Sequence, residues 1–280
     1  GDIGTSPLYV FKAIVGTHVI TEQLILGGLS CVFWTLTLLT TIKYVYLALN
    51  ADNKGEGGIF ALYALVRRYK ASWVIYPAII GCTTLISDGF ITPAISISSA
   101  VEGLSLKYSH IPIVPIVIGI LVLLFFFQQF GTSVVGKTFG PIMLVWFIVI
   151  GVLGIAQLWG NFYVLKAINP IYAWDLLTKY PQGFWLLGAI FLCTTGAEAL
   201  YADLGHCGKG NIRISWGFVK ACLLLNYFGQ GAWLLQHVGT TLGAQIPFYT
   251  IMPPFFLDFG IVIATMAAVI ASQALISGTF

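Results

Sequence analysis

The sequence predicts an all-helical protein that crosses a membrane several times, and its composition is the first observation behind that prediction. Of its 280 residues, 58% are hydrophobic and only 8% are charged, and the mean hydropathy is +0.93. An average soluble domain is about 25% charged, so this chain has too few charges to cover a surface in water. A soluble globular protein and a disordered chain are therefore disfavoured. The small, scattered net charge of +3 also disfavours nucleic acid as a partner.

Long apolar runs are the second observation, since a span needs about 20 apolar residues. Frequent glycine and proline inside these runs predict helix breaks, which in a membrane must be satisfied by protein or line a cavity. We interpret residues 1–280 as a single transmembrane domain truncated at both ends, because the first run is short and the last is cut. The predicted spans lie near 5–20, 24–49, 72–100, 112–130, 138–159, 184–205, 214–236 and 256–280.

Lysine and arginine predict the orientation, because cytoplasmic loops are richer in them. If the segment after the second span is cytoplasmic, nine basic residues lie inside and four lie outside. The missing N-terminus is then cytoplasmic, and the lipid bilayer is expected to be the plasma (inner) membrane. The inner set is Lys43, Lys54, Arg67, Arg68, Lys70, Lys137, Lys209, Arg213 and Lys220. The outer set is Lys12, Lys107, Lys166 and Lys179.

Two polar segments separate spans on the predicted inner side. Residues 56–70 are too short to span and are basic at one end, which predicts an inner interfacial helix. Residues 206–215 are predicted to form an inner linker. One segment follows the second span and the other follows the sixth, so the spacing indicates an inverted repeat of five spans.

Ionisable side chains at membrane depth are costly and are candidates for function. The first acidic motif is residues 1–9, Gly-Asp-Ile-Gly-Thr-Ser-Pro-Leu-Tyr. Two glycines around an acid predict an unwound turn, and the proline that follows suits the first turn of a helix. Asp2, Ser6 and Tyr9 follow the spacing i, i+4, i+7, which predicts one shared face.

The second motif, in the third predicted span, places Asp88, Thr92 and Ser96 at i, i+4, i+8, so three oxygen groups stack on one stripe. Pro93 leaves the carbonyl of Gly89 without its helical donor. For Ser96 alone, a bond to the preceding turn is an equally good interpretation.

The third motif, residues 194–198 of the sixth span, is a glycine-interrupted helix that carries Glu198. Paired broken helices point to the binding site of a transporter. Glu102 and Asp203 lie near span ends and are predicted to be interfacial, and Asp258 is predicted to stand at an outer helix start, where an acid complements the helix dipole.

These groups together predict a cation site. Carboxylate, hydroxyl and backbone carbonyl oxygens can replace the hydration shell of an alkali ion. A carboxyl group in an apolar site can also carry a proton near neutral pH. Ion binding coupled to proton binding is therefore the predicted chemistry.

Residues 131–138 match the phosphate-binding pattern G-x-x-x-x-G-K-T. That motif requires a preceding strand in a parallel sheet, whereas the preceding run is long and membrane-like. We therefore interpret it as a glycine-hinged turn between spans, with Lys137 near the inner boundary, and we disfavour an ATPase.

Several longer motifs, in this order, resemble those of the KUP/HAK/KT potassium uptake transporters. They are Gly-Asp-Ile-Gly-Thr-Ser-Pro-Leu-Tyr (1–9), Gly-Glu-Gly-Gly-Ile-Phe-Ala-Leu (55–62), Asp-Gly-Phe-Ile-Thr-Pro-Ala-Ile-Ser (88–96) and Thr-Gly-Ala-Glu-Ala-Leu-Tyr-Ala-Asp-Leu-Gly-His (195–206). Residues 226–232 and 270–278 extend the resemblance over essentially the whole chain.

This resemblance implies a LeuT-like fold of the amino acid–polyamine–organocation superfamily, with twelve spans of which the chain holds the first, in part, to the eighth. It implies potassium uptake by proton symport, hence a secondary active transporter and no enzyme, with no cofactor beyond the transported K+ and H+. It also implies a homodimer in the full-length protein. The implied potassium-site residues are Asp2, Tyr9, Asp88, Thr92, Ser96 and Thr195, and the implied proton-coupling residue is Glu198. Groups that the family uses on span 10 are missing here.

Two other transporter classes remain as alternatives. An amino-acid permease of the same fold binds a carboxylate at a helix N-terminus and leaves few acids in its pocket. A cation channel is expected to repeat a pore-lining filter sequence, and no such repeat is visible. The three acids favour the proton-coupled potassium carrier over both.

Overall fold

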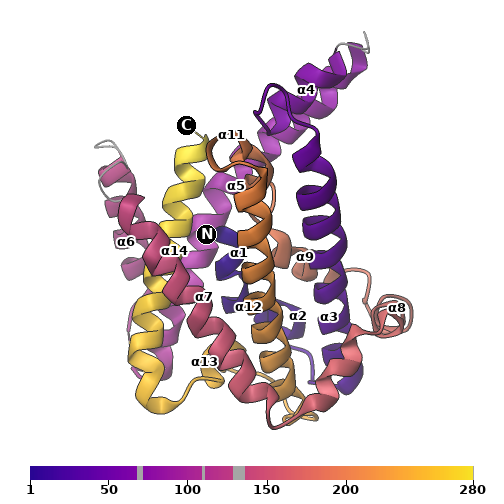
Figure 1. Cartoon of the computed structure of the whole chain (residues 1–280). Coiled ribbons are helices and arrows are strands. Elements are labelled where there is room, and N and C mark those ends of the chain that lie inside the picture. The colour runs from indigo at the N-terminus through magenta and orange to yellow at the C-terminus, as the bar shows by residue number, and fades with distance from the viewer. Residues whose placement is uncertain (68–71, 109–110, 129–135, 280) are drawn as a thin grey trace.

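The protein is a bundle of long helices with short helical pieces at its centre (Figure 1). The computed structural model describes residues 1–67, 72–108, 111–128 and 136–279, and these form helices, loops and isolated β-bridges. Several described helices are long and apolar enough to cross a membrane, which confirms a polytopic all-helical protein. They cover Glu22–Asn50, Ile75–Leu106, Thr138–Leu158 and Pro254–Ile276.

The second predicted span is one continuous rod of changing helical pitch. Helix α3 (Glu22–Thr35) starts at Thr21, whose hydroxyl accepts a hydrogen bond from the Leu24 amide at 3.2 Å. It continues as a π-helical segment, Leu36–Leu47, and ends in a 3₁₀ turn, Ala48–Asn50. A π-helix has an extra residue in each turn and is common at functional sites.

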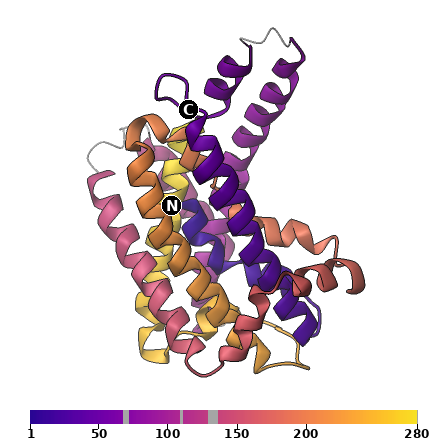
Figure 2. The same ribbon diagram turned by 45° about the vertical axis from the view of Figure 1, so that its right-hand side comes forward.

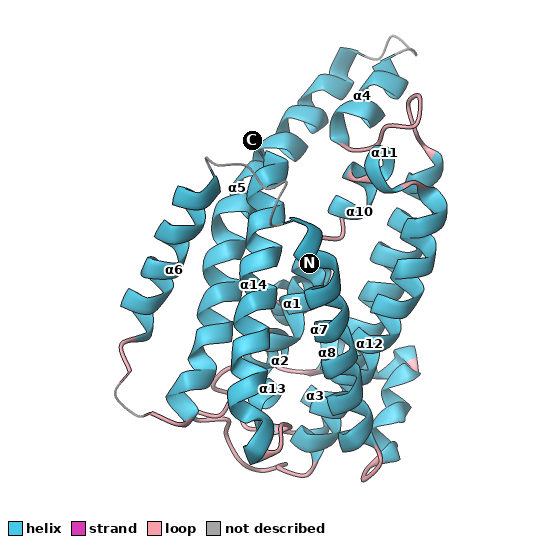
Figure 3. Ribbon diagram, turned by 60° about the vertical axis from the view of Figure 1, so that its left-hand side comes forward, coloured by secondary structure: helices cyan, strands magenta, loops and turns pink. Residues whose placement is uncertain are grey.

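The remaining long helices correspond to the predicted third, fourth, fifth, seventh and eighth spans. They are α5 (Ile75–Val101), α6 (Ile113–Gln128), α7 (Gly136–Leu158), α12 (Lys209–Leu235) and α14 (Leu257–Thr279). Helix α12 packs along α7, and α14 packs along α5. Helix α6 stands on the flank of the bundle (Figure 3).

The first span is broken, but not where the sequence predicted. Helix α1 (Asp2–Thr5) is followed by a 3₁₀ turn, Ser6–Leu8, and then by α2 (Val10–Val15). The predicted unwound turn at residues 1–4 is therefore wrong, and the irregular backbone lies at residues 6–9. Pro7 explains the shift, because it has no amide hydrogen to continue the α-helical ladder.

The sixth span is broken near the expected glycine. Helix α9 (Leu186–Phe191) and a 3₁₀ turn, Leu192–Thr194, lead into irregular backbone at 195–198. Short helices α10 (Ala199–Ala202) and α11 (Leu204–Cys207) follow. The two broken spans lie against each other at the centre of the bundle, through contacts of α2 with α9 and of their two 3₁₀ turns.

The polar segments take different forms. Within 56–70, α4 (Ile59–Arg67) is helical and pairs with the start of α5 in a hairpin that projects from the bundle (Figure 2). Residues 206–215, expected to be a linker, are mostly helical, because α12 already begins at Lys209 after Gly208. Of residues 131–138, those up to 135 lie outside the described residues, and the run before them is the helix α6 rather than a strand.

Short elements cover the end of the bundle opposite α4. They include α8 (Pro170–Lys179), which the sequence did not predict, the 3₁₀ segment Phe162–Ile168, α13 (Pro247–Thr250) and the 3₁₀ turn Pro254–Phe256. We call this the α13 end and the opposite one the α4 end (Figure 1). A 3₁₀ turn, Ser72–Val74, precedes α5 at the α4 end, and another, Glu102–Leu106, follows α5 at the α13 end.

Candidate ion-binding site

Gly196, in the break of the sixth span, lies against Asp2 of α1, the short helix that precedes the break of the first span. Gly196 has φ +81°, a backbone conformation that residues with a side chain rarely adopt. A Cβ atom at this position would lie 2.7 Å from the Cβ and 2.8 Å from the Oδ2 of Asp2. The sixth span thus presents bare backbone to the carboxylate of the first.

Hydroxyl groups connect the same two breaks. Ser6 Oγ and Thr195 Oγ1 both donate to the carbonyl oxygen of Leu192, at 3.0 and 3.1 Å. The phenol oxygen of Tyr9 lies 3.3 Å from Ser6 Oγ. Tyr9 and Ser6 are buried, and Thr195 is partly buried. The predicted residues Tyr9 and Thr195 therefore belong to one hydroxyl cluster, which the sequence spacing within each span could not reveal.

Helix α5 supplies the third side of the site. Thr92 Oγ1 donates to Asp88 Oδ1 at 2.6 Å, which orients that carboxylate along the predicted stripe. The hydroxyl oxygens of Ser96 and Thr5 lie 3.3 Å apart and join α5 to α1. The sequence analysis did not single out Thr5, although it lies in the motif around Asp2.

Two of the carboxylates are incompletely paired. Asp2 is only 8% exposed, and within the described residues its Oδ2 atom has no hydrogen-bond partner. The Oδ2 atom of Asp88 is likewise buried and without a partner there. Burying a charge is unfavourable unless it is paired, so these oxygens provide two positions for a cation or a proton.

Asp2, Asp88 and Glu198 line a single cavity of about 670 Å³. The cavity extends from the helix breaks toward the α4 end, where its lining includes the π-helical segment, α4 and α10. The structure therefore brings all three predicted acids together, and no carboxylate from the predicted site lies elsewhere.

Side chains of α7 and α12 donate hydrogen bonds to backbone carbonyls of the broken first span. Trp146 Nε1 donates to the carbonyl of Gly4 at 2.9 Å, and Gln230 Nε2 donates to the carbonyl of Pro7 at 2.9 Å. Gln230 also donates to Asn226 Oδ1 at 2.8 Å, and all three side chains are buried. The sequence analysis missed this support. The only sequence feature that could have indicated these hydrogen bonds is the presence of amide side chains within an apolar span.

The polar side chains at the α13 end form ion pairs. Lys12 Nζ lies 2.6 Å from Glu102 Oε2, and Lys107 Nζ lies 2.6 Å from Asp258 Oδ2. Asp258 stands in the first turn of α14, as predicted. These acids thus have partners outside the site.

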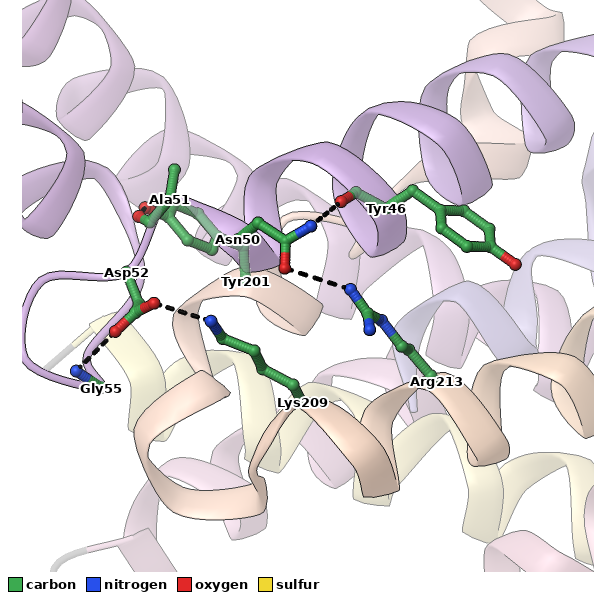
Figure 4. Close-up of polar contacts among 8 residues, drawn as sticks. All are labelled: Tyr46, Asn50, Ala51, Asp52, Gly55, Tyr201, Lys209 and Arg213. Atoms are coloured by element: carbon green, nitrogen blue, oxygen red, sulfur yellow. Dashed lines mark hydrogen bonds and ion pairs between the residues drawn. The ribbon is translucent and has the colours of Figure 1, made fainter.

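At the α4 end, residues 50–58 form a loop that we call the strap. Hydrogen bonds connect it to α10 and α12 (Figure 4). Tyr201 donates to the carbonyl of Ala51 at 2.5 Å, and Lys209 donates to Asp52 Oδ1 at 2.7 Å. A Cβ atom on Gly57 would lie 1.9 Å from the carbonyl oxygen of Tyr201, so the strap touches α10 backbone to backbone. Because Gly58 and Tyr201 also line the cavity, the strap closes part of its wall.

Lys209 stabilises the ionised form of the strap's aspartate. Its hydrogen bond, together with one from the amide of Gly55 at 2.9 Å, holds the pKa of Asp52 below its ordinary value. Asp52 and Lys209 come from segments far apart in the sequence, which explains why the sequence analysis did not pair them.

The chain matches the family described as the K+ potassium transporter integral membrane domain over residues 1–280. It belongs to this potassium transporter family. This membership confirms the resemblance found in the motifs. Together with the apolar helices it makes the chain a multi-pass membrane protein, which in bacteria means the plasma membrane.

Three relatives illustrate the relationship. The chain is 64% identical to a probable potassium transport system protein Kup of Cytophaga hutchinsonii, with 100% of the chain and 43% of the relative covered. It is 54% identical to a probable Kup 1 protein of Lactococcus lactis and 53% identical to a probable Kup protein of Clostridium perfringens. Each alignment covers 100% of the chain, with 44% and 45% of the relative. The chain spans less than half the length of these relatives, and no solved structure matches it.

Proposed function

We propose that the full-length protein takes up potassium across the plasma membrane by proton-coupled symport. The names of the relatives above support potassium as the substrate. The amino-acid permease is not favoured, because the family is a potassium transporter family and the site carries three acids. Proton coupling rests on the chemistry of the cavity.

The potassium ion binds between the first, third and sixth spans in this proposal. Asp2 and Asp88 supply charge, and Tyr9, Thr92, Ser96 and Thr195 supply hydroxyl oxygens near the helix breaks. Such hard oxygen donors replace the hydration shell of K+. K+ is the transported substrate at this site, not a resident cofactor.

Glu198 carries the coupled proton in this scheme. Protonated Glu198 removes one of the mutually repelling charges in the cavity, which permits the loaded site to open to the cytoplasm. Loss of the proton there accompanies release of K+. The two broken spans act as the moving part of a LeuT-like inverted repeat, with the α4 end facing the cytoplasm. The inner basic residues on the π-helical segment, α4 and α12 support this orientation.

One observation carries the proposal: a nine-tenths buried aspartate, with an unpartnered oxygen, faces the positive-φ glycine of a second broken helix. A buried carboxylate of this kind requires a counter-ion or a proton. A merely structural acid would be expected to have a basic partner, as Glu102, Asp52 and Asp258 do.

Rubidium uptake into proteoliposomes tests the proposal. The full-length protein is reconstituted, an inward proton gradient is imposed without ATP, and wild type is compared with Glu198→Gln. We expect gradient-driven uptake that the variant loses. Uptake indifferent to both gradient and variant would indicate a channel or a differently coupled carrier. Lys137→Ala is the control for the ATPase interpretation, and we expect it to transport normally.

A further inference from the structure

A lysine shares the cavity with the site's acids. Lys43 lies in the π-helical segment of the second span and lines the same cavity as Asp2, Asp88 and Glu198. Its ammonium group and the carboxylate of Glu198 therefore share one space. Lys43 is the basic side chain of a lining that also carries Asp203. The scheme above gives this ammonium group no role.

Lys43 differs from the lysines that form ion pairs with acidic side chains. Lys12, Lys107, Lys179 and Lys209 each form an ion pair at 2.6 or 2.7 Å. None of the ion pairs among the described residues includes Lys43, whose Nζ lies 4.9 Å from the ring centroid of the adjacent Tyr44. Its side chain is exposed to the cavity side of the bundle and carries its charge on a flexible four-carbon stem.

Release of K+ creates an electrostatic problem in this cavity. Once K+ and the coupled proton have left, at least three carboxylates remain in one apolar-walled space, and Asp2 is nearly fully buried. Unpaired buried charges are strongly unfavourable. The empty protein can return to its starting conformation only if a cation compensates them, and a tethered ammonium needs no binding from solution.

We propose that Lys43 is a built-in counter-cation that moves beside Glu198 after K+ and the proton leave, so that the empty transporter can reorient. This role rests on the proposed function and deepens it. The next K+ and proton displace the ammonium back toward the cavity mouth. Lys43 lies on the π-helical segment, a backbone geometry that is frequent at functional sites.

Comparing two transport modes distinguishes this role of Lys43 from a general loss of folding or activity. Net uptake requires the empty protein to reorient, whereas exchange of external rubidium for internal potassium moves only the loaded protein. In Lys43→Gln we expect net uptake to fall about tenfold or more, with exchange kept within about twofold of wild type. Lys43→Arg retains the positive charge and is expected to recover most of the net uptake. Normal exchange also shows that each variant is folded.

Lys220→Gln is the matched control. Lys220 is another lysine within a long helix, but it bonds to Thr37 Oγ1 at 3.1 Å and does not line the cavity. We expect any loss in this variant to affect both modes equally. Equal loss of both modes in Lys43→Gln, unchanged net uptake in it, or no recovery in Lys43→Arg would each overturn the role of Lys43. Failure of the wild-type protein in both modes would instead overturn the proposed function, and the role of Lys43 with it.

Discussion

Gly196, in the break of the sixth span, is in direct contact with Asp2 of α1, whose Oδ2 is only 2.8 Å from where a Gly196 side chain would begin. The carboxylate is therefore positioned by the absence of a side chain on the opposite helix. This contact joins the first and sixth spans at the proposed ion site. Even alanine, the smallest possible substitution for Gly196, is therefore expected to disturb the site.

Gly196→Ala is expected to reduce rubidium uptake about tenfold or more, because the methyl group displaces Asp2 and the backbone is strained at φ +81°. The measurement is initial uptake rate in proteoliposomes at equal protein density. Gly188→Ala is the control, since Gly188 lies in α9 with open space around it and ordinary helical backbone. Normal uptake by Gly196→Ala would contradict the importance of this contact.

Asp88 and Thr92 should have separable effects on transport. Asp88→Asn removes a proposed ligand charge and is expected to abolish uptake. Thr92→Val removes a proposed ligand hydroxyl and releases Asp88 Oδ1 from its 2.6 Å hydrogen bond but keeps the charge of Asp88, so we expect KM for rubidium to rise about three- to tenfold with a smaller change in kcat. Uptake kinetics over a range of rubidium concentrations measure both values.

Thr83→Val serves as the control for Thr92. Thr83 is an exposed residue of the same helix, and its hydroxyl donates to backbone carbonyls of the preceding turn. Both wild-type KM and wild-type kcat are expected for it. Full uptake by a protein carrying both Asp2→Asn and Asp88→Asn would refute the proposed site.

The sequence predicted the helical class, most of the long helices and three acids that the structure brings into one cavity, because apolar length and rare intramembrane charges are local signals. It misplaced the first break, since two glycines around Asp2 suggested an unwound turn while the missing amide of Pro7 decided the outcome. Contacts between distant segments, such as Gln230 with Pro7, could not be predicted from spacing within one helix. Residues 206–215, where the sequence predicted a linker, are mostly helical, and Lys209 within them contacts Asp52 of the strap.

The ion pair of Asp52 and Lys209 is expected to hold the strap against α10 and α12. Asp52→Lys or Lys209→Asp should each place like charges together and lower net uptake, and the double swap should restore much of it. The contact is expected to persist at neutral pH. Because the pKa of Asp52 is lowered by Lys209 in the folded state, the stability it contributes is present above the ordinary value of 3.8 and is lost as the pH falls through the lowered pKa.

Cross-linking can report on the strap directly. Cysteines placed at Asn50 and Arg213, whose side chains are hydrogen-bonded at 3.3 Å, should be joined by a short bifunctional thiol reagent with the swapped charges as with the native ones. In this assay the native cysteines are first replaced by serine or alanine. A swap that restores neither uptake nor cross-linking would show that the charges act through other partners.

Gln230 is expected to stabilise the broken first span without contacting the ion. Gln230→Met keeps the side-chain volume but leaves the buried carbonyl of Pro7 and the Oδ1 atom of Asn226 without their donor. An unsatisfied buried acceptor costs about 1–3 kcal/mol, so the thermal midpoint in detergent should fall clearly. Gln236→Met, just beyond the end of α12, is the matched control and should leave the midpoint unchanged. If Gln230→Met kept its midpoint but altered rubidium KM, Gln230 would belong to the ion site rather than to its support.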